Sequence, residues 1–264
     1  MNTSGNPATT LRKDLLQVGI YPDRDSMGNA AATQVGEMLK SLLSSQSGVR
    51  MIFAAAPSQN EFLLSLSRCV GVDWKRVTAL HMDEYLGLEP DAPQLFGNFL
   101  KERIFRRVPF GRVHYIDPDL KTAAEECHRY SALLREAPVD IVCMGIGENG
   151  HIAFNDPHVA DFNDRSLVKV VDLDSRSREQ QVHDKCFDRL EDVPRRAITL
   201  TIPALLSGRS LFIIVPGSAK AQAVYRGLCG EIDESCPASI LRTHAHARLF
   251  LDTDSASKLL ATHQ

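Results

Sequence analysis

Hydrophobic and polar positions along the chain follow two periods, one typical of helices and one typical of buried strands. Over residues 25–43, apolar side chains recur every three to four positions, which predicts an amphipathic helix. The run 49–56 that follows is short and mostly apolar, as expected for a strand buried on both faces. Polar residues 57–60 end this run, and a second helical pattern occupies residues 61–70.

The same alternation continues to the end of the chain. We expect strands at 77–82, 113–116, 139–144, 197–201, 210–215 and 248–251, and helices at 96–105, 122–135, 202–206, 219–228 and 256–262. Strands that alternate with helices form a mostly parallel sheet with helices on both faces. The sequence therefore predicts a single-domain, three-layer, doubly wound α/β fold of the Rossmann-like kind over residues 16–264, after an N-terminal tail at 1–15.

Composition and charge exclude several classes of function. The 264 residues are 44% hydrophobic and carry a formal net charge of -3, with no basic block. We therefore expect no nucleic-acid partner and no membrane partner, and no apolar run reaches the roughly 20 residues that span a bilayer. The six cysteines include no C-x-x-C pair, and residues 1–12 are polar. Free thiols in a reducing cytoplasm are expected.

The predicted topology indicates where a ligand binds. In open α/β sheets, ligands lie at the carboxyl ends of the strands, where loops lead into helices. Four loops follow predicted strands in this way, at residues 57–61, 83–88, 145–157 and 216–220. We expect a ligand site built from these loops.

The loop 145–157 carries the strongest chemical signal. Gly145, Gly147 and Gly150 permit tight turns and a close approach of backbone to ligand. His151 follows at once, and Asp156 comes five residues later. A carboxylate beside a histidine fixes its tautomer and raises its basicity, so that the pair can move protons at neutral pH. A glycine-rich turn with a purely structural histidine is the alternative.

The other three loops carry weaker signals. Asp83 and Glu84 end a predicted strand, where a carboxylate can act as a general base or simply be solvated. Ser58 begins a strand-to-helix loop that suits either an anion or an N-cap. Lys220, in the first turn of a predicted helix, is either a point charge for an anion or an exposed surface lysine.

Together, these segments resemble the glucosamine-6-phosphate deaminase/6-phosphogluconolactonase superfamily over about residues 25–261. The runs 82–88 (MDEYLGL) and 150–157 (GHIAFNDP) are similar to the deaminase branch rather than the lactonase branch. The resemblance implies isomerisation of an aldose to a ketose with deamination, on an amino sugar phosphate of the glucosamine 6-phosphate or galactosamine 6-phosphate type. The products would be a ketose phosphate and ammonia. It further implies no metal and no organic cofactor, and relatives are often homo-oligomers.

The resemblance also assigns roles to individual residues. Asp83 would be the base that moves a proton between C2 and C1 of the sugar. His151 would assist opening of the pyranose ring, supported by Asn149 and Asp156. The remaining matched positions would bind substrate: Ser58, Gln59, Asn60, Glu84, Gly147 and Lys220.

Two departures from the family pattern bear on catalysis. Asn149 stands where the deaminases usually have an acid, and an amide can orient His151 but cannot supply charge. Some relatives that act on galactosamine 6-phosphate also have an asparagine at the position of Asn149. Asp156 replaces a glutamate and is one methylene shorter, which retains the charge.

Larger departures concern the phosphate. The two glycines of the usual phosphate loop are replaced by Gln59 and Asn60, and Glu61 would oppose a phosphate if it faced inward. The position of an arginine that helps to bind phosphate in the deaminases is matched by Gln181. We therefore hypothesise a changed substrate, either a different sugar phosphate or a sugar whose distal group is not phosphate.

Two other functions remain open on the sequence alone. A sugar lactonase of the 6-phosphogluconolactonase type would need the histidine but not an enolising base. A non-catalytic sugar-binding or regulatory protein would account for Asn149 and the altered loop. His244 and His246 alternate like a metal-ligand pair, but without further spaced ligands we favour a structural role and expect no metal site.

Overall fold

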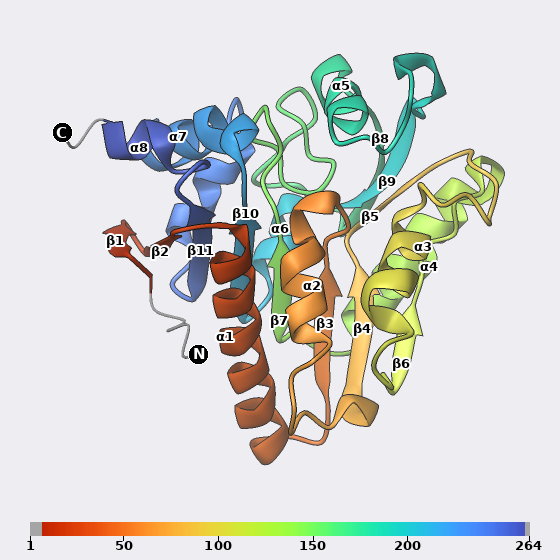
Figure 1. Ribbon diagram of the computed structural model, residues 1–264. Helices are drawn as coiled ribbons and strands as arrows, with labels where there is room; N and C mark the ends of the chain where they lie inside the picture. The colour runs from red at the N-terminus through yellow and green to blue at the C-terminus, as the bar shows by residue number, and fades with distance from the viewer. Residues whose placement is uncertain (1–6, 262–264) are drawn as a thin grey trace.

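The computed structural model describes residues 7–261, which form two sheets with flanking helices (Figure 1). The larger sheet has eight strands in the order β1-β2-β11-β10-β7-β3-β4-β6, and all neighbouring pairs except β1 with β2 are parallel. Its strands are β1 (Thr9–Lys13), β2 (Leu16–Tyr21), β3 (Val49–Phe53), β4 (Val77–His81), β6 (Arg112–His114), β7 (Ile141–Met144), β10 (Ser210–Val215) and β11 (Ala247–Asp252).

The smaller sheet is antiparallel and lies beside the carboxyl ends of the large one, at the upper right of Figure 1. Its strands are β5 (Asp83–Tyr85), β9 (Arg196–Leu200) and β8 (Val168–Asp172), in that order. The helices are α1 (Arg24–Ser45), α2 (Asn60–Leu66), α3 (Phe96–Leu100), α4 (Ala123–Glu136), α5 (Ser175–His183), α6 (Ile202–Leu206), α7 (Ala221–Cys229) and α8 (Ser257–Ala261).

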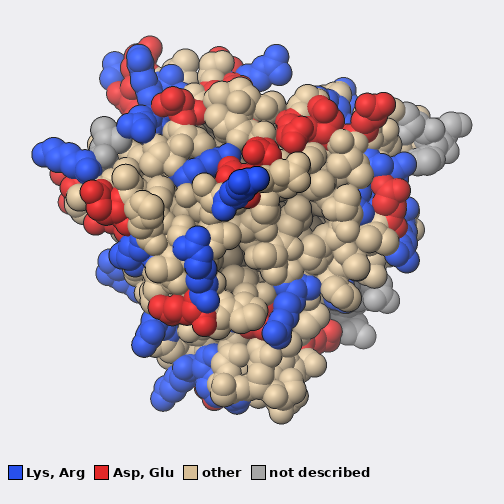
Figure 2. All heavy atoms as spheres, turned by 180° about the vertical axis from the view of Figure 1, so that it is seen from behind, with Lys and Arg blue, Asp and Glu red and all other residues tan. Residues whose placement is uncertain are grey.

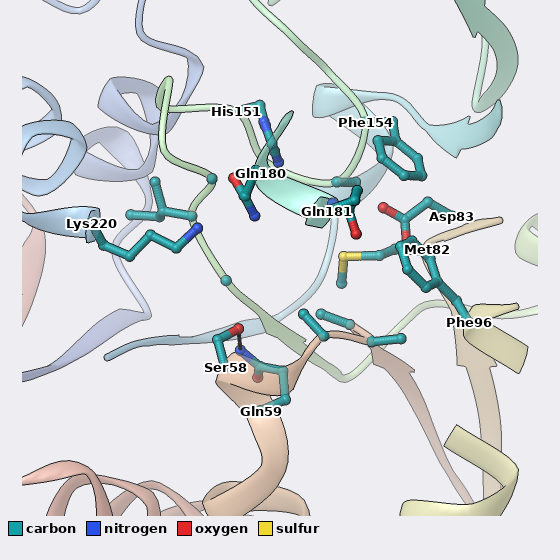
Figure 3. Close-up of a pocket in the computed structure, with 17 residues that line it drawn as sticks. Ser58, Gln59, Met82, Asp83, Phe96, His151, Phe154, Gln180, Gln181 and Lys220 are labelled. Carbon is teal, nitrogen blue, oxygen red and sulfur yellow. Dashed lines mark hydrogen bonds between the residues drawn. The ribbon is translucent and has the colours of Figure 1, made fainter. Parts of the chain in front are cut away.

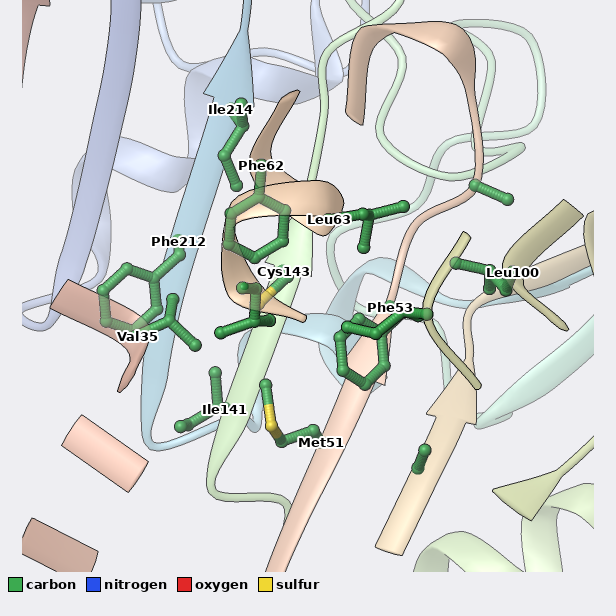
Figure 4. Close-up of a cluster of buried hydrophobic side chains, with 14 of the residues drawn as sticks. Val35, Met51, Phe53, Phe62, Leu63, Leu100, Ile141, Cys143, Phe212 and Ile214 are labelled. Carbon is green, nitrogen blue, oxygen red and sulfur yellow. The ribbon is translucent and has the colours of Figure 1, made fainter. Parts of the chain in front are cut away.

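Alternate side chains of the central strands enter two separate cores, and this produces the three layers. Phe53, Cys143 and Ile214 point into the core under α1, α2 and α3, which Figure 4 shows. Their strand neighbours, such as Val142 and Ile213, point into the second core, which also contains buried residues of α4, α6 and α7. Because both faces of β3, β7 and β10 are buried, these strands are mostly apolar, with Arg50 and Ser210 as the exceptions, which confirms the predicted α/β class.

The order of the strands creates a switch point in the middle of the large sheet. From β3 the chain moves outward through β4 to β6, then returns to β7 and moves outward through β10 to β11. The loops after β3 and β7 therefore leave the sheet in opposite directions. This divergence opens the crevice in which α/β proteins hold ligands.

Two expectations about strands were wrong. Residues 9–13, expected in a loose tail, form edge strand β1, which pairs with β2 from Thr9↔Ile20 to Lys13↔Leu16. Its side chains are largely exposed, so it has no apolar period that would reveal it. The strand expected at 197–201 exists as β9 but belongs to the antiparallel sheet. Residues 1–6 of the expected tail lie outside the described residues.

The surface seen from behind mixes charges of both signs (Figure 2). Lysine and arginine side chains are spread over its middle and its margin, interspersed with aspartate and glutamate side chains and separated by uncharged surface. This face therefore presents no broad region of a single charge. Within residues 7–261, none of the helices combines the length and the apolar character needed to cross a membrane.

Candidate active site

A pocket lies at the switch point, bounded by the loops after β3, β4, β7 and β10 and by α5 (Figure 3). At one end Asp83 lies between Phe96 and Phe154, and at the other Lys220 extends its side chain into the pocket. His151 points into the space between them. The four predicted loops therefore all contribute to one site.

The structure brings most of the predicted residues together. Those that line the pocket are Ser58, Gln59, Asp83, Gly147, His151 and Lys220. Asn149 and Asp156 lie behind His151 and contact its ring rather than the open pocket. Glu84 and Asn60 do not line the pocket.

His151 is held by three polar side chains at one ring nitrogen. Its Nδ1 lies 2.8 Å from Oδ1 of Asn149, 2.9 Å from Oγ of Ser177 and 3.1 Å from Oδ1 of Asp156. Asn149 also accepts a hydrogen bond from the backbone N–H of His151 at 3.0 Å. The ring is thus fixed from behind, and Nε2 is left for whatever occupies the pocket.

These contacts determine which ring nitrogen carries the proton. The Nδ2 amide of Asn149 donates to Oδ1 of Asp156 at 2.9 Å, because a carboxylate can only accept. Oδ1 of Asn149 therefore faces His151 as an acceptor, and Nδ1 must be the donor. Neutral His151 then presents the lone pair of Nε2 to the pocket, which is the form that takes up a proton.

Asp156 supplies the negative charge behind this histidine. It is fully buried, and its other oxygen, Oδ2, accepts from the backbone N–H of Asp174 at 3.2 Å. Burial alone would raise the pKa of Asp156. The hydrogen bond and charge of His151, with donors from Asn149 and Ser177, outweigh burial and hold this pKa well below its usual range. A permanent carboxylate here stabilises the imidazolium that forms when Nε2 is protonated.

Gly147 lies directly against the ring of His151. A Cβ atom at position 147 would come within 2.1 Å of Cε1 and 2.2 Å of Nε2 of His151. Its backbone N–H donates to the carbonyl of His151 at 2.9 Å. Gly147 therefore fixes the position of the His151 ring as well as lining the pocket. Any residue with a Cβ atom at position 147 would displace the ring.

Asp83 lies in an apolar environment at the other side of the pocket. It is 6% exposed and stands beside Met82, Phe96 and Phe154. Burial, and next the charge of Glu84, raise the pKa of Asp83 well above its ordinary value. A carboxylate that has lost its hydration is a stronger base, as removal of a proton from carbon requires.

Glu84, expected to bind substrate, instead ties β5 to α3. Oε1 accepts from the backbone N–H groups of Tyr85 and Phe96, each at 2.9 Å, and Oε2 accepts from Gly97 at 2.8 Å. Burial raises the pKa of Glu84, and these three donors offset part of that rise. Adjacent residues of a strand point to opposite sides, so Asp83 faces the pocket and Glu84 faces away from it.

Asn60 and Glu61 also face away from the pocket. Both line a separate groove against α1, together with Arg68, and Glu61 forms an ion pair with Arg24 at 3.1 Å. Asn60 therefore does not line this pocket, and its binding of substrate stays a prediction. Glu61 does not oppose a ligand there.

One element of the site, helix α5, had no signal in the apolar pattern of the sequence, although the family resemblance singled out Gln181 within it. Ser177, Gln180 and Gln181 all come from α5, whose nine residues are almost wholly polar and have no apolar period. Ser177 donates to Asp156 in a short hydrogen bond and also contacts Nδ1 of His151. Only the N-cap at Asp174, which accepts from the backbone N–H of Arg176, marks the start of this helix in the sequence.

Within residues 7–261, no group of three or more histidine, cysteine, aspartate or glutamate side chains is placed to bind one metal ion. The alternating pair His244 and His246 has local contacts instead. Nε2 of His244 lies 3.0 Å from the carbonyl of Gly208, and Nδ1 of His244 accepts from the backbone N–H of His246 at 3.2 Å.

The sequence is similar to known proteins over most of its length. A family model described as glucosamine-6-phosphate isomerases/6-phosphogluconolactonase matches residues 22–251. A glucosamine-6-phosphate deaminase from Exiguobacterium sp. strain AT1b is 37% identical over 187 residues, covering 71% of this chain and 72% of that protein. One from Listeria innocua serovar 6a is 35% identical over 188 residues, covering 71% of this chain and 78% of that protein.

Comparisons of structure lead to the same fold. A monomeric glucosamine-6-phosphate deaminase aligns with a TM-score of 0.82 at 26% identity, covering 91% of this chain and 98% of that one. A 6-phosphogluconolactonase from Thermotoga maritima aligns with a TM-score of 0.73 at 20% identity, covering 90% of this chain and 99% of that one. At that identity, the second likeness shows the fold alone.

Proposed function

Since the chain belongs to the glucosamine-6-phosphate isomerase/6-phosphogluconolactonase family, we propose that it is an enzyme that isomerises and deaminates an amino sugar. The substrate is an amino sugar of the glucosamine or galactosamine type, with or without the 6-phosphate group, and the products are the corresponding ketose and ammonia. The observation that carries the proposal is the pairing of a dehydrated carboxylate, Asp83, with a supported histidine, His151, in one pocket.

Opening of the pyranose ring is the first step. Ring opening transfers the proton of the C1 hydroxyl to the ring oxygen, so that C1 becomes an aldehyde. His151 suits this transfer because Nε2 faces the pocket and Nδ1 is backed by Asn149, Ser177 and Asp156. The buried charge of Asp156 stabilises the imidazolium that exists between proton uptake and proton release.

Asp83 suits the next step, the movement of a proton from C2 to C1. The carboxylate takes the proton from C2, and the electron pair forms a C1–C2 double bond. The π electrons of the C1 carbonyl move to its oxygen, which takes a proton from the ammonium group at C2. Asp83 then returns the proton to C1, which leaves a protonated imine at C2. Water adds to this carbon and ammonia departs, so the overall deamination consumes one water molecule. Phe96 and Phe154 keep bulk water from the carboxylate during the transfer.

The test is turnover by the purified protein. Glucosamine 6-phosphate, galactosamine 6-phosphate and their unphosphorylated forms are supplied, and ammonia and ketose are measured together. We expect the two products in equal amounts from at least one of these sugars. Asp83→Asn should lower kcat by about 1,000-fold, within the range for loss of a general base. Asp91→Asn, at an exposed position outside the pocket, is the matched control.

A sugar lactonase is the second candidate, because the T. maritima lactonase shares the fold. Lactone hydrolysis requires no removal of a proton from carbon, so it gives no reason for a carboxylate buried beside Phe96. Asp83→Asn separates the two functions. The loss should be severe for the isomerase and mild for a lactonase, with 6-phosphogluconolactone hydrolysis measured alongside.

A cytoplasmic location is part of the proposal. The six cysteines are all free thiols, which suits a reducing compartment. Fractionation of cells that express the protein is the test. The homo-oligomer expected from the resemblance stays a prediction, which size-exclusion chromatography with light scattering can check.

A further inference from the structure

Five polar residues line the pocket in addition to Asp83 and His151, and we call them the amide subsite. They are Ser58, Gln59, Gln180, Gln181 and Lys220. If the proposed function holds, C1 and C2 of the sugar lie at Asp83, the ring oxygen lies at His151, and the far end of the sugar lies in this subsite. The chemistry of the subsite therefore decides what group the substrate carries at that end.

The loop after β3 is not a cradle for a phosphate group. Such a cradle needs several free backbone N–H groups that point at the anion. Pro57 has no N–H group. The N–H groups of Gln59 and Asn60 already donate to the carbonyls of Ala56, at 2.9 Å, and Pro57. The N–H of Ser58 has no acceptor among the described residues, so this turn offers a single N–H group rather than several.

The side chain of Gln59 fills the space above this turn. Gln59 is 1% exposed, and its Nε2 donates to Oγ of Ser58 at 3.2 Å and to the carbonyl of Ile214 at 3.1 Å. The same atom lies 3.2 Å from where a Cβ of Gly145 would stand. A phosphate could approach the loop backbone only if Gln59 moved and gave up these contacts.

In the loop after β10, a carboxylate of the protein itself accepts from the backbone. The backbone N–H of Gly217 lies 3.0 Å from each carboxylate oxygen of Asp252, which is buried. Pro216 has no N–H group to offer. Asp252 therefore occupies the position that a bound anion would take on this N–H group.

Positive charge in the subsite is limited to Lys220. Its Nζ is buried and has no hydrogen-bond partner among the described residues. Burial lowers the pKa of Lys220, while the charges of Asp184 and Glu148 raise it. Gln180 accepts a hydrogen bond from the backbone N–H of Glu148 at 2.8 Å and donates one to the carboxylate of Asp184 at 3.2 Å. One ammonium supplies a single positive charge, which offsets only part of the charge of a phosphate ester.

The same groups suit a hydroxyl. An amide side chain both donates and accepts hydrogen bonds, as a hydroxyl does. Gln59 and Gln180 already bond within the protein, so Gln181 and Ser58 are the groups of the subsite that can meet a ligand hydroxyl. Gln181 has no side-chain hydrogen bond within residues 7–261, so its amide is available to a ligand. We propose that the amide subsite selects an amino sugar with a neutral terminal hydroxyl group and discriminates against the phosphate ester.

The test compares glucosamine with glucosamine 6-phosphate, and galactosamine with galactosamine 6-phosphate. We expect kcat/KM to be higher for the unphosphorylated sugar of the better pair by about tenfold or more, the effect of one charge-assisted hydrogen bond. A phosphate ester that is used equally well or better overturns the inference.

A gain of function provides the second arm. Gln181→Arg adds a fork of donors to the subsite, and we expect the kcat/KM ratio to move toward the phosphate ester by about tenfold. Glu179→Gln makes the same change in net charge on the exposed side of the same helix, and should leave the ratio within about twofold. A ratio that does not respond to Gln181→Arg counts against the assignment of the subsite.

Binding separates failure of this inference from failure of the proposed function. If none of the four sugars is deaminated, the proposed function is wrong. Isothermal titration calorimetry of the wild-type protein and of Asp83→Asn with each sugar still measures whether the amino sugar or its 6-phosphate binds more tightly. Tighter binding of glucosamine than of its 6-phosphate supports the inference. Tighter binding of the phosphate ester, or binding of neither sugar, overturns it.

Discussion

A Cβ atom at position 147 would lie 2.1 Å from Cε1 of His151, well inside van der Waals contact. The histidine and the glycine are therefore one structural unit, although they are four positions apart in the chain. The turn between them is closed by hydrogen bonds from the N–H of Gly147 to the carbonyl of His151 and from the N–H of Gly150 to the carbonyl of Gly147. The His151 ring packs in one position, between this turn and the side chains of α5.

Gly147→Ala should displace the ring and lower kcat. A misplacement of about 1 Å costs roughly 100-fold in rate, while the strand and helix layers do not depend on this turn. Gly227→Ala is the control, because a Cβ there meets Ala238 at an ordinary 3.7 Å. Steady-state kinetics and circular dichroism measure activity and fold. Unchanged kcat in Gly147→Ala would contradict the conclusion that Gly147 fixes the position of the His151 ring.

Asp156→Asn should weaken proton transfer without unfolding the protein at neutral pH. The amide leaves the shape of the site but removes the charge that stabilises the imidazolium of His151, at a cost of about 100-fold in kcat. Its effect on KM should be small, since Asp156 is buried behind the ring. A variant in which only KM rises would show that Asp156 acts in binding instead.

The low pKa of Asp156 also sets an acid limit on stability. A group whose folded pKa is depressed stabilises the fold above its unfolded pKa of about 3.9, and this contribution is lost as pH falls toward the folded value. The wild-type protein should therefore lose stability below about pH 4 more steeply than Asp156→Asn does. Parallel thermal melts from pH 3 to pH 7 test this difference.

Asn149→Asp, which introduces the acid usual in the deaminases, should destabilise this chain. The amide of Asn149 now donates to Asp156 at 2.9 Å, and a second carboxylate would meet the first at that distance. Like charges raise the pKa of one member of the pair. The variant is therefore more stable when one of the two carboxyl groups is protonated. Its free energy of unfolding should be about 1–3 kcal/mol below that of the wild type, and this difference should grow as pH rises from 5 to 8.

Melting temperatures of Asn149→Asp and wild type at pH 5, 6.5 and 8 test that prediction. Asn149→Ser is a useful comparison, because it removes the amide without adding charge. An Asn149→Asp variant that is equally stable at each pH would mean that the site rearranges to separate the two carboxylates.

Glu84→Gln should loosen the aromatic wall of the pocket. Glutamine has one acceptor oxygen in place of two, so at least one of the N–H groups of Tyr85, Phe96 and Gly97 would lose its partner. A buried unpaired donor costs about 1–3 kcal/mol. Because Phe96 lines the pocket, KM should rise as well. Urea unfolding and steady-state kinetics measure the two effects, and a change in neither would contradict the role of Glu84.

The local pattern of the sequence was sufficient for the layers and for the position of the site. Mostly apolar runs marked β3, β7 and β10 because these strands are buried on both faces, and the period of α1 marked its buried stripe. The ends of the predicted strands then indicated the positions of the site loops, since ligands bind where parallel strands end. Asp83, Gly147 and His151 were found by that route together with the family resemblance.

Only the tertiary structure decided which of two adjacent polar residues faces the ligand. Asp83 and Glu84 are both carboxylates in one strand, and Gln59 and Asn60 are both amides in one turn, so composition cannot distinguish them. Their directions depend on what packs against each side, namely α3 behind Glu84 and α1 beside Asn60. The edge pairing of β1 and the support of His151 by Ser177 likewise depend on partners distant in the chain. Long-range contacts of this kind leave no period in a local sequence.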